Sequence, residues 1–205
     1  MLIVETFKKL SDQFCLRKST DIKMLLRTEN GIPGFTIPKT LKEIYKISNG
    51  FSLLDYCFIG ARGSKPDIET ITFGLWNTND CLNLDFVSLI TTSYNLNVGF
   101  LKKIKNKSNE HYIAFNDDIL EDSLVVISSS IELFLYRFFN LIKEFTPFKK
   151  NEFCINDDLW LYDMTWWLDN DPELVEAYRS GKLVYYYKNN KNFIEFIDNY
   201  LDSHK

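Results

Sequence analysis

Residues 37–50 read Ile37-Pro38-Lys39-Thr40-Leu41-Lys42-Glu43-Ile44-Tyr45-Lys46-Ile47-Ser48-Asn49-Gly50, and this stretch decides the fold. Pro38 suits the first turn of a helix, because the N–H that proline lacks has no partner within that turn. The apolar residues that follow at helical spacing predict one buried face, made of Leu41, Ile44, Tyr45 and Ile47. Asn49-Gly50 is a helix stop, since both residues tolerate a left-handed backbone. We therefore expect an amphipathic helix that ends in a sharp turn.

Two helical segments are expected ahead of this stretch. Apolar residues recur at steps of three and four over residues 3–15, which predicts an amphipathic helix. Residues 21–28 predict a second helix or helical turn. Its apolar side chains Ile22, Leu25 and Leu26 are expected to face inward.

Short apolar segments beyond the decisive stretch predict strands. Residues 51–59 and 68–76 each read as one strand, and residues 60–66 read as the loop between them. Residues 82–98 fit either a helix or a strand. The basic run 101–109 reads as a loop or the end of a short helix.

A hairpin and a long helix are expected to complete this body. Residues 112–115 and 124–127 predict two strands joined by a polar turn. A serine at 129–130 caps the helix that follows. Apolar residues, Phe134 and Phe138 among them, occur on most sides of this helix, so it should be largely buried.

The chain divides into a body over residues 1–148 and an acidic, Trp-rich extension over residues 151–205. Within the extension, Asp171-Pro172-Glu173 is a strong helix start. Residues 183–187 read as a strand and residues 193–201 as a final helix. The whole chain predicts an α+β protein in which helices back a central antiparallel or mixed sheet, with a C-terminal α/β extension packed on the same body.

Composition and charge narrow the class of protein. Of the 205 residues, 45% are hydrophobic, which is enough for a sizeable core. A net charge of −4 argues against a nucleic-acid groove, which needs an excess of Lys and Arg, and suits a basic partner. Residues 1–50 hold nine Lys or Arg and five Asp or Glu, whereas residues 151–205 hold five and eleven. This asymmetry also fits ordinary solvated faces.

The cysteines and the N-terminus favour a cytoplasmic location. Cys15, Cys57, Cys81 and Cys154 have neither CxxC spacing nor histidines at zinc-finger spacing, so we expect reduced thiols that act as small hydrophobes. The first residues lack the basic start and long apolar run of a signal peptide. Since no apolar stretch approaches 18 residues, no membrane span is expected. Neither a metal nor a cofactor is expected.

The order of these segments resembles the SUKH superfamily, which includes bacterial immunity proteins and fungal cell-wall regulators. Residues 37–50 are similar to its opening signature, a Leu/Ile-Pro start, an amphipathic helix and Asn-Gly before a strand. Residues 112–118, Tyr-Ile-Ala-Phe-Asn-Asp-Asp, resemble its strand and acidic turn, and residues 123–135 resemble its closing strand and helix. The resemblance covers roughly residues 20–145 and leaves residues 151–205 unexplained.

The resemblance implies a central sheet backed by helices and a binding module without a shared catalytic residue. Many bacterial members of the superfamily resemble antidotes that bind and block a toxin. Because fold alone does not fix function, this implication is weighed beside the chemistry of the residues themselves.

Few residues have a catalytic pattern. His204 lies next to the end of the chain, so any Ser-His-Asp device would use His111, which we expect at the partly exposed start of a strand. The loop 60–66 lacks the Gly-Lys-Ser/Thr ending of a phosphate loop. The basic run 102–107 lacks interleaved aromatics and reads as solvated.

Two acidic segments are the candidate sites. In the first, four acids fall within six residues; paired carboxylates can serve glycoside hydrolysis or bind a cation, but a hairpin turn also favours Asp. The second, residues 157–171, holds three Trp and five Asp. Trp is typical both of cores and of interface anchors. The residues predicted to bind a partner are Asp117, Asp118, Glu121, Asp122, Asp157, Asp158, Trp160, Asp163, Trp166, Trp167, Asp169 and Asp171.

The sequence supports three hypotheses of function. The first is an immunity or antitoxin-type protein, not an enzyme, that binds a toxin domain stoichiometrically; a basic nuclease is one such toxin, because opposite charge speeds docking. The second is a regulatory scaffold of cell-wall or signalling control, which would bind endogenous proteins. The third is a hydrolase that uses the first acidic segment.

Overall fold

The computed structural model of the chain describes residues 2–53, 56–76, 85–92, 96–116, 124–144 and 159–204. These residues form one seven-stranded sheet in which strands adjacent in sequence are adjacent in space, and every pair is antiparallel. The strands are β1 (Cys15–Leu16), β2 (Phe51–Leu53), β3 (Tyr56–Phe58), β4 (Phe86–Thr91), β5 (Asn97–Lys105), β6 (His111–Asn116) and β7 (Val125–Ser128). The predicted α+β class with a central sheet is confirmed, and the sheet is antiparallel rather than mixed.

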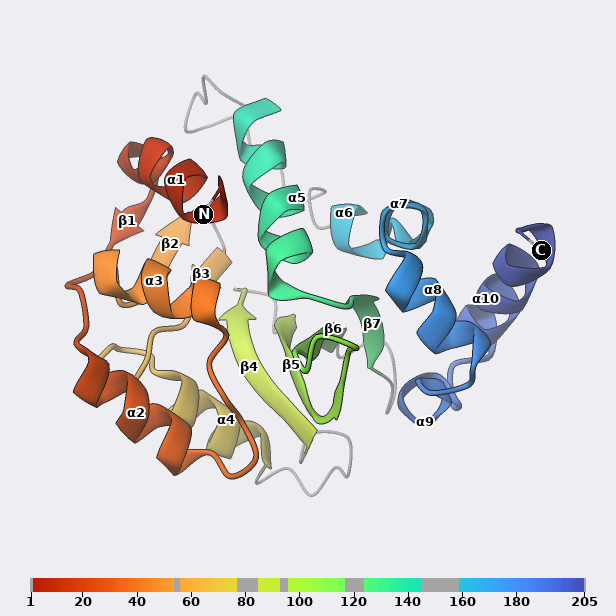
Figure 1. Cartoon of the computed structure of the whole chain (residues 1–205), viewed down its shortest axis with the longest axis horizontal. Coiled ribbons are helices and arrows are strands. Elements are labelled where there is room, and N and C mark those ends of the chain that lie inside the picture. Colours follow the sequence, from red (N-terminus) through yellow and green to blue (C-terminus); the bar gives the residue numbers. More distant parts are fainter. Residues whose placement is uncertain are drawn as a thin grey trace.

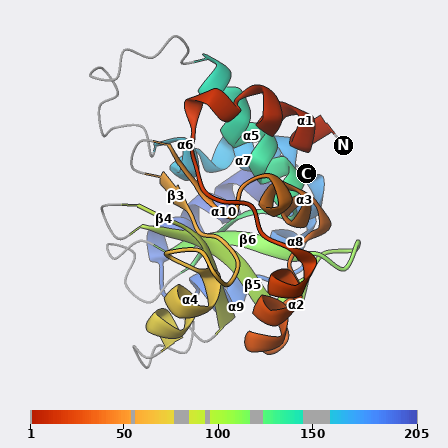
Figure 2. The same ribbon diagram turned by 90° about the vertical axis from the view of Figure 1, so that its left-hand side faces the viewer.

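Helices cover both faces of the sheet and one of its edges. The helices in the described residues are α1 (Leu2–Lys9), α2 (Ile22–Gly31), α3 (Lys39–Ile47), α4 (Ile68–Trp76), α5 (Ile131–Glu144), α6 (Leu159–Tyr162), α7 (Met164–Asn170), α8 (Pro172–Arg179), α9 (Val184–Tyr187) and α10 (Lys191–Ser203). Figure 1 shows α6 to α10 beside β7, at the opposite edge of the sheet from β1. Figure 2 shows α1, α3 and α5 on one side of the sheet and α4 on the other.

The strand register explains where the main core lies. One row of paired residues crosses the sheet from β2 to β7 and is apolar throughout: Phe51, Phe58, Ile90, Val98, Phe115 and Val125. The ring of Phe51 lies 4.9 Å from that of Phe7 in α1, and the ring of Phe58 lies 4.9 Å from that of Phe138 in α5. The predicted core residues Leu41, Ile44, Phe134 and Phe138 are all buried, as expected.

The stretch 37–50 joins α3 to the sheet through its polar groups. The hydroxyl of Tyr45 donates to the carbonyl of Ile59 over 2.6 Å. The side chain of Asn49 accepts from the N–H of Ala61 over 2.7 Å and donates to its carbonyl over 3.2 Å. Gly50 has a φ of +87°, and a Cβ there would lie 2.7 Å from the carbonyl oxygen of Phe58. The motif therefore fixes the fold at this junction.

Two segments predicted as single strands have another structure. Residues 51–59 contain two strands, β2 and β3, which pair with each other as a hairpin. Residues 68–76 form the helix α4, because the carboxylate of Asp67 caps its first turn by accepting from the N–H of Thr70 over 2.9 Å. The alternation of apolar residues was therefore misleading here, and the capping Asp67 was the better signal.

Three further expectations are corrected. Strand β5 continues to Lys105, so the basic run is mostly strand, and it turns near Asn109, which has a φ of +64°. Residues 184–187 are helical rather than extended. In α2 only Leu25 of the three named side chains is buried, since Ile22 is 62% exposed and Leu26 51% exposed. The reason is that α2 contacts α4 along one narrow face.

The C-terminal helices cover the outer edge of β7. The N–H of Leu124 donates to the carbonyl of Tyr186 over 2.9 Å, and the hydroxyl of Tyr178 donates to the carbonyl of Val126 over 2.6 Å. These contacts satisfy backbone groups that an edge strand would otherwise present to other chains. Buried apolar residues of residues 1–148 and of the extension belong to a single core cluster.

Candidate partner-binding surface

The first acidic segment lies between two well-placed strands. Asp117, Asp118, Glu121 and Asp122 are outside the described residues, as are Asp157 and Asp158 of the second segment. Asn116 ends β6 and Leu124 directly precedes β7. The segment therefore leaves and re-enters the sheet at the same end of two paired strands.

Asp163 organises the exposed part of the second segment. Its carboxylate caps α7 by accepting from the N–H of Trp166 over 3.2 Å, and it lies 2.9 Å from the guanidinium of Arg137 in α5. Arg137 is buried and lies 3.9 Å from the centre of the Trp166 ring and 4.6 Å from that of Trp167. Burial lowers the pKa of Arg137, and the neighbouring Asp163 opposes that effect. Asp163 and Trp166 are therefore held in place at the surface by a buried cation.

Trp167 is a core residue, and its prediction as a partner-binding anchor is wrong. Its side chain is 0% exposed. The ring stacks on Phe134 of α5 with centroids 6.1 Å apart, and its Nε1 donates to the carbonyl of Leu161 over 3.2 Å. Trp166, the adjacent ring, is only partly buried. The side chain of Trp160 lies outside the described part of the chain.

Asp171 is also structural, so its prediction as a docking residue is wrong. It is 3% exposed. One carboxylate oxygen caps α8 by accepting from the N–H of Leu174 over 3.0 Å, and the other accepts from the N–H of Ser129 over 2.6 Å. Asp171 therefore ties the extension to the end of β7. Asp169 is exposed and accepts from the hydroxyl of Tyr200 over 2.7 Å.

A cavity of about 290 Å³ opens where the extension meets the sheet. Its described floor consists of the buried side chains Phe115, Val125, Met164 and Phe193. Its described rim consists of Tyr162, Asn190, Asn192 and Phe196. The exposed ring of Tyr162 stands edge-on against Phe115, with centroids 4.9 Å apart. The cavity is mainly aromatic and is shared by β6, β7, α6, α7 and α10.

The cavity brings the two predicted segments to one surface. Phe115 and Val125 flank the first acidic segment in sequence, and Tyr162 and Met164 belong to the second. The contribution of α10, through Phe193 and its neighbours, was not foreseen. Its available signal was a helix that carries several aromatic residues close together in an acidic extension.

His111 is buried rather than partly exposed, which corrects the sequence-based expectation. It begins β6 and is 3% exposed. Its Nδ1 lies 2.9 Å from the carbonyl oxygen of Leu101, and its ring packs against that of Phe35. Burial lowers the pKa of His111, which favours the neutral imidazole. This histidine therefore serves the core.

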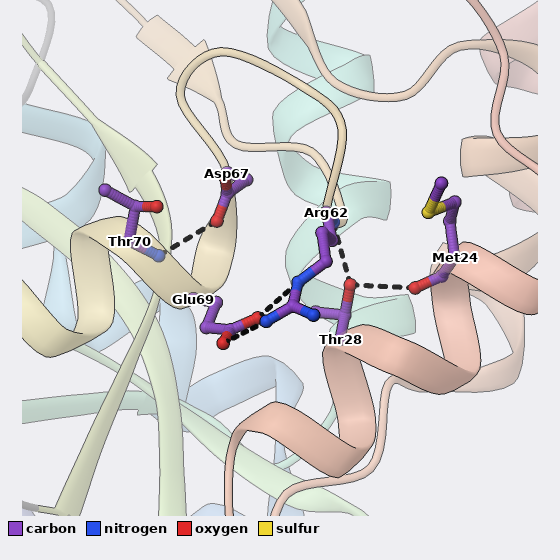
Figure 3. A network of polar contacts seen from close by, with 6 residues as sticks. All are labelled: Met24, Thr28, Arg62, Asp67, Glu69 and Thr70. Carbon is purple, nitrogen blue, oxygen red and sulfur yellow. Dashed lines mark hydrogen bonds and ion pairs between the residues drawn. The ribbon is translucent and has the colours of Figure 1, made fainter.

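The loop 60–66 is bound internally, as Figure 3 shows. The N–H of Arg62 donates to the hydroxyl of Thr28, over 2.8 Å, and that hydroxyl donates to the carbonyl of Met24 over 3.0 Å. The guanidinium of Arg62 makes a two-pronged ion pair with Glu69 of α4. The loop therefore links α2 to α4 and does not have the form of a phosphate cradle.

The cysteines are less buried than expected. Cys15 is exposed and Cys57 partly exposed, and both are free thiols. Cys81 and Cys154 lie outside the described residues. Within the described ranges, no three His, Cys, Asp or Glu side chains gather as a metal site would require. No helix in that part of the chain has both the length and the apolar character to cross a membrane.

Comparison with known proteins returned no assignment: no protein-family model matches the chain, and no curated protein matches it significantly. The resemblance to the SUKH superfamily therefore depends on the short residue patterns alone.

Proposed function

We propose that this chain is an immunity or antitoxin-type protein that neutralises a toxin domain by binding it stoichiometrically. The observation that carries the proposal is the aromatic cavity at which both acidic segments meet. The resemblance of residues 37–50, 112–118 and 123–135 to the SUKH superfamily adds independent support, because that superfamily includes immunity proteins.

The physical basis of the proposal is a division of labour at this surface. Acidic side chains attract a basic partner over long range and raise the rate of encounter. Large aromatic side chains that become buried on binding slow dissociation, because their contacts must be lost before the partner leaves. Tyr162 and Trp166 are exposed or partly exposed in the chain and can act in this way.

The test is co-expression with the protein encoded by the neighbouring gene. We expect that the neighbouring product carries a toxic domain, that the chain restores growth, and that the two purify as a complex of fixed stoichiometry. A chain that gives no protection, and that instead binds an endogenous cell-wall or signalling protein, would contradict the proposal and favour the regulatory scaffold.

A further inference from the structure

The floor of the cavity is suited to an apolar group. Phe115 is 1% exposed and Val125 3% exposed, so their side chains offer carbon surface with little contact to bulk water. Met164 adds a flexible side chain, which adapts to irregular shapes. A volume of about 290 Å³ is at the small end of ligand cavities, which span roughly 300–1,000 Å³. It has room for one or two large side chains.

The rim is suited to a peptide that carries such a group. Asn192 is exposed, and its amide can both donate to and accept from a peptide backbone. The phenol of Tyr162 is 40% exposed and held edge-on against Phe115. Asn190 is engaged, because its side chain caps α10 by accepting from the N–H of Phe193 over 3.0 Å. Polar rims around apolar centres are typical of protein interfaces.

Acidic residues flank the lining residues on every segment. Exposed Asp163 separates Tyr162 from Met164, and exposed Glu195 directly precedes Phe196 of the rim. Four acids and no Lys or Arg occur between Phe115 and Val125 in the sequence. A partner segment that approaches this cavity therefore gains from positive charge.

We propose that the cavity receives one large apolar side chain, Phe, Leu or Met, carried on a Lys- or Arg-rich segment of the partner. This inference rests on the function proposed above and adds the chemistry of the recognised segment. The apolar side chain fills the floor, while the flanking cations lie against Asp163, Glu195 and the acidic segment between β6 and β7.

Synthetic pentapeptides test the inference without a toxin. The probes are acetyl-Lys-Lys-Phe-Lys-Lys-amide, the same peptide with Ala in place of Phe, and the same peptide with Glu in place of each Lys. Binding to the full chain is followed by amide NMR shifts at low salt. We expect saturable shifts at Val125, Met164 and Phe193 for the first peptide. Affinity should be about ten-fold lower without the ring, from the apolar area lost, and lower again with reversed flanks.

A matched pair of variants locates the site. Asn192→Trp places a bulky ring at the rim of the cavity, whereas Asn199→Trp makes the same change at an exposed position of α10 outside the cavity. We expect Asn192→Trp to abolish binding of the Phe peptide and Asn199→Trp to preserve it. Both positions are exposed, so thermal unfolding of both variants should remain close to that of the unchanged chain.

Each alternative result overturns the inference. Equal binding of the Phe and Ala peptides excludes an apolar occupant, and equal binding of the Lys and Glu peptides excludes a basic one. Equal loss in both Trp variants excludes this cavity. Self-association that Asn192→Trp removes, without peptide binding, assigns the cavity to a second copy. A toxin complex insensitive to Asn192→Trp would preserve the proposed function and overturn only this inference.

Discussion

Residues 37–50 and residues 159–171 are both dense in aromatic and polar side chains, but the two segments use them differently. In the first, Tyr45 and Asn49 direct their polar groups inward to the backbone of Ile59 and Ala61. In the second, inward and outward side chains alternate: Trp167 is buried, whereas Asp163 is exposed. A motif whose polar groups all bond to distant backbone serves the fold. A motif that is divided between core and surface retains groups for a partner.

The largest expected effect separates two adjacent rings of the second segment. Trp167→Ala should lower the free energy of unfolding by about 3–5 kcal/mol, because it leaves a cavity against Phe134. Trp166→Ala should lower it by only about 1 kcal/mol, mainly through the lost contact with the guanidinium of Arg137. Urea denaturation of both variants measures the difference. Equal losses would show that both rings belong to the core.

The next effect tests the first segment. Asn49→Ala should lower the free energy of unfolding by about 2–4 kcal/mol, because it leaves both backbone groups of Ala61 without the Asn49 side chain. Asn49→Asp is the informative companion, since its carboxylate still accepts from Ala61 but can no longer donate. Its loss should be smaller. A negligible loss in Asn49→Ala would remove the structural reading of the Asn-Gly motif.

A smaller effect tests how the extension is held on β7. Asp171→Asn should lower the free energy of unfolding by about 1–3 kcal/mol, because one carboxylate oxygen that accepts from a backbone N–H is replaced by a donor. Asp169→Asn is the matched control at an exposed site, and we expect a change within about 0.5 kcal/mol. Thermal unfolding followed by circular dichroism compares the two. Similar shifts would mean that Asp171 is not the link.

Much of this architecture is local and could be predicted from the sequence. Helices α3, α5 and α8 were found because their starts have strong signals, such as Pro38, Ser130 and Asp171, ahead of apolar periodicity. The helix α4 and the strand β5 were missed, because the apolar alternation of one and the lysines of the other contradict their neighbours in space.

The candidate surface was only half visible for a different reason. The sequence marked its acidic and Trp-rich segments by composition, but composition does not distinguish buried Trp167 from partly exposed Trp166. The cavity itself arises from pairing over long range, since Phe115 and Phe193 are separated by most of the last two strands and five helices. No local pattern carries that information.

The smallest expected effect concerns how the partner arrives. Charge reversal at Asp117, Asp118 and Asp122 should lower the association rate with the cognate toxin by about three-fold at physiological salt, where the Debye length is about 8 Å. The reduction should grow as salt is lowered, because exposed charges are then less screened. Trp166→Ala should instead raise the dissociation rate, since it removes an apolar contact formed after docking. Stopped-flow kinetics at several salt concentrations measure both rates, with thermal unfolding of the same variants as the control for folding. An association rate that acid reversal leaves unchanged at every salt concentration would remove electrostatic docking, and the aromatic cavity would then carry recognition alone.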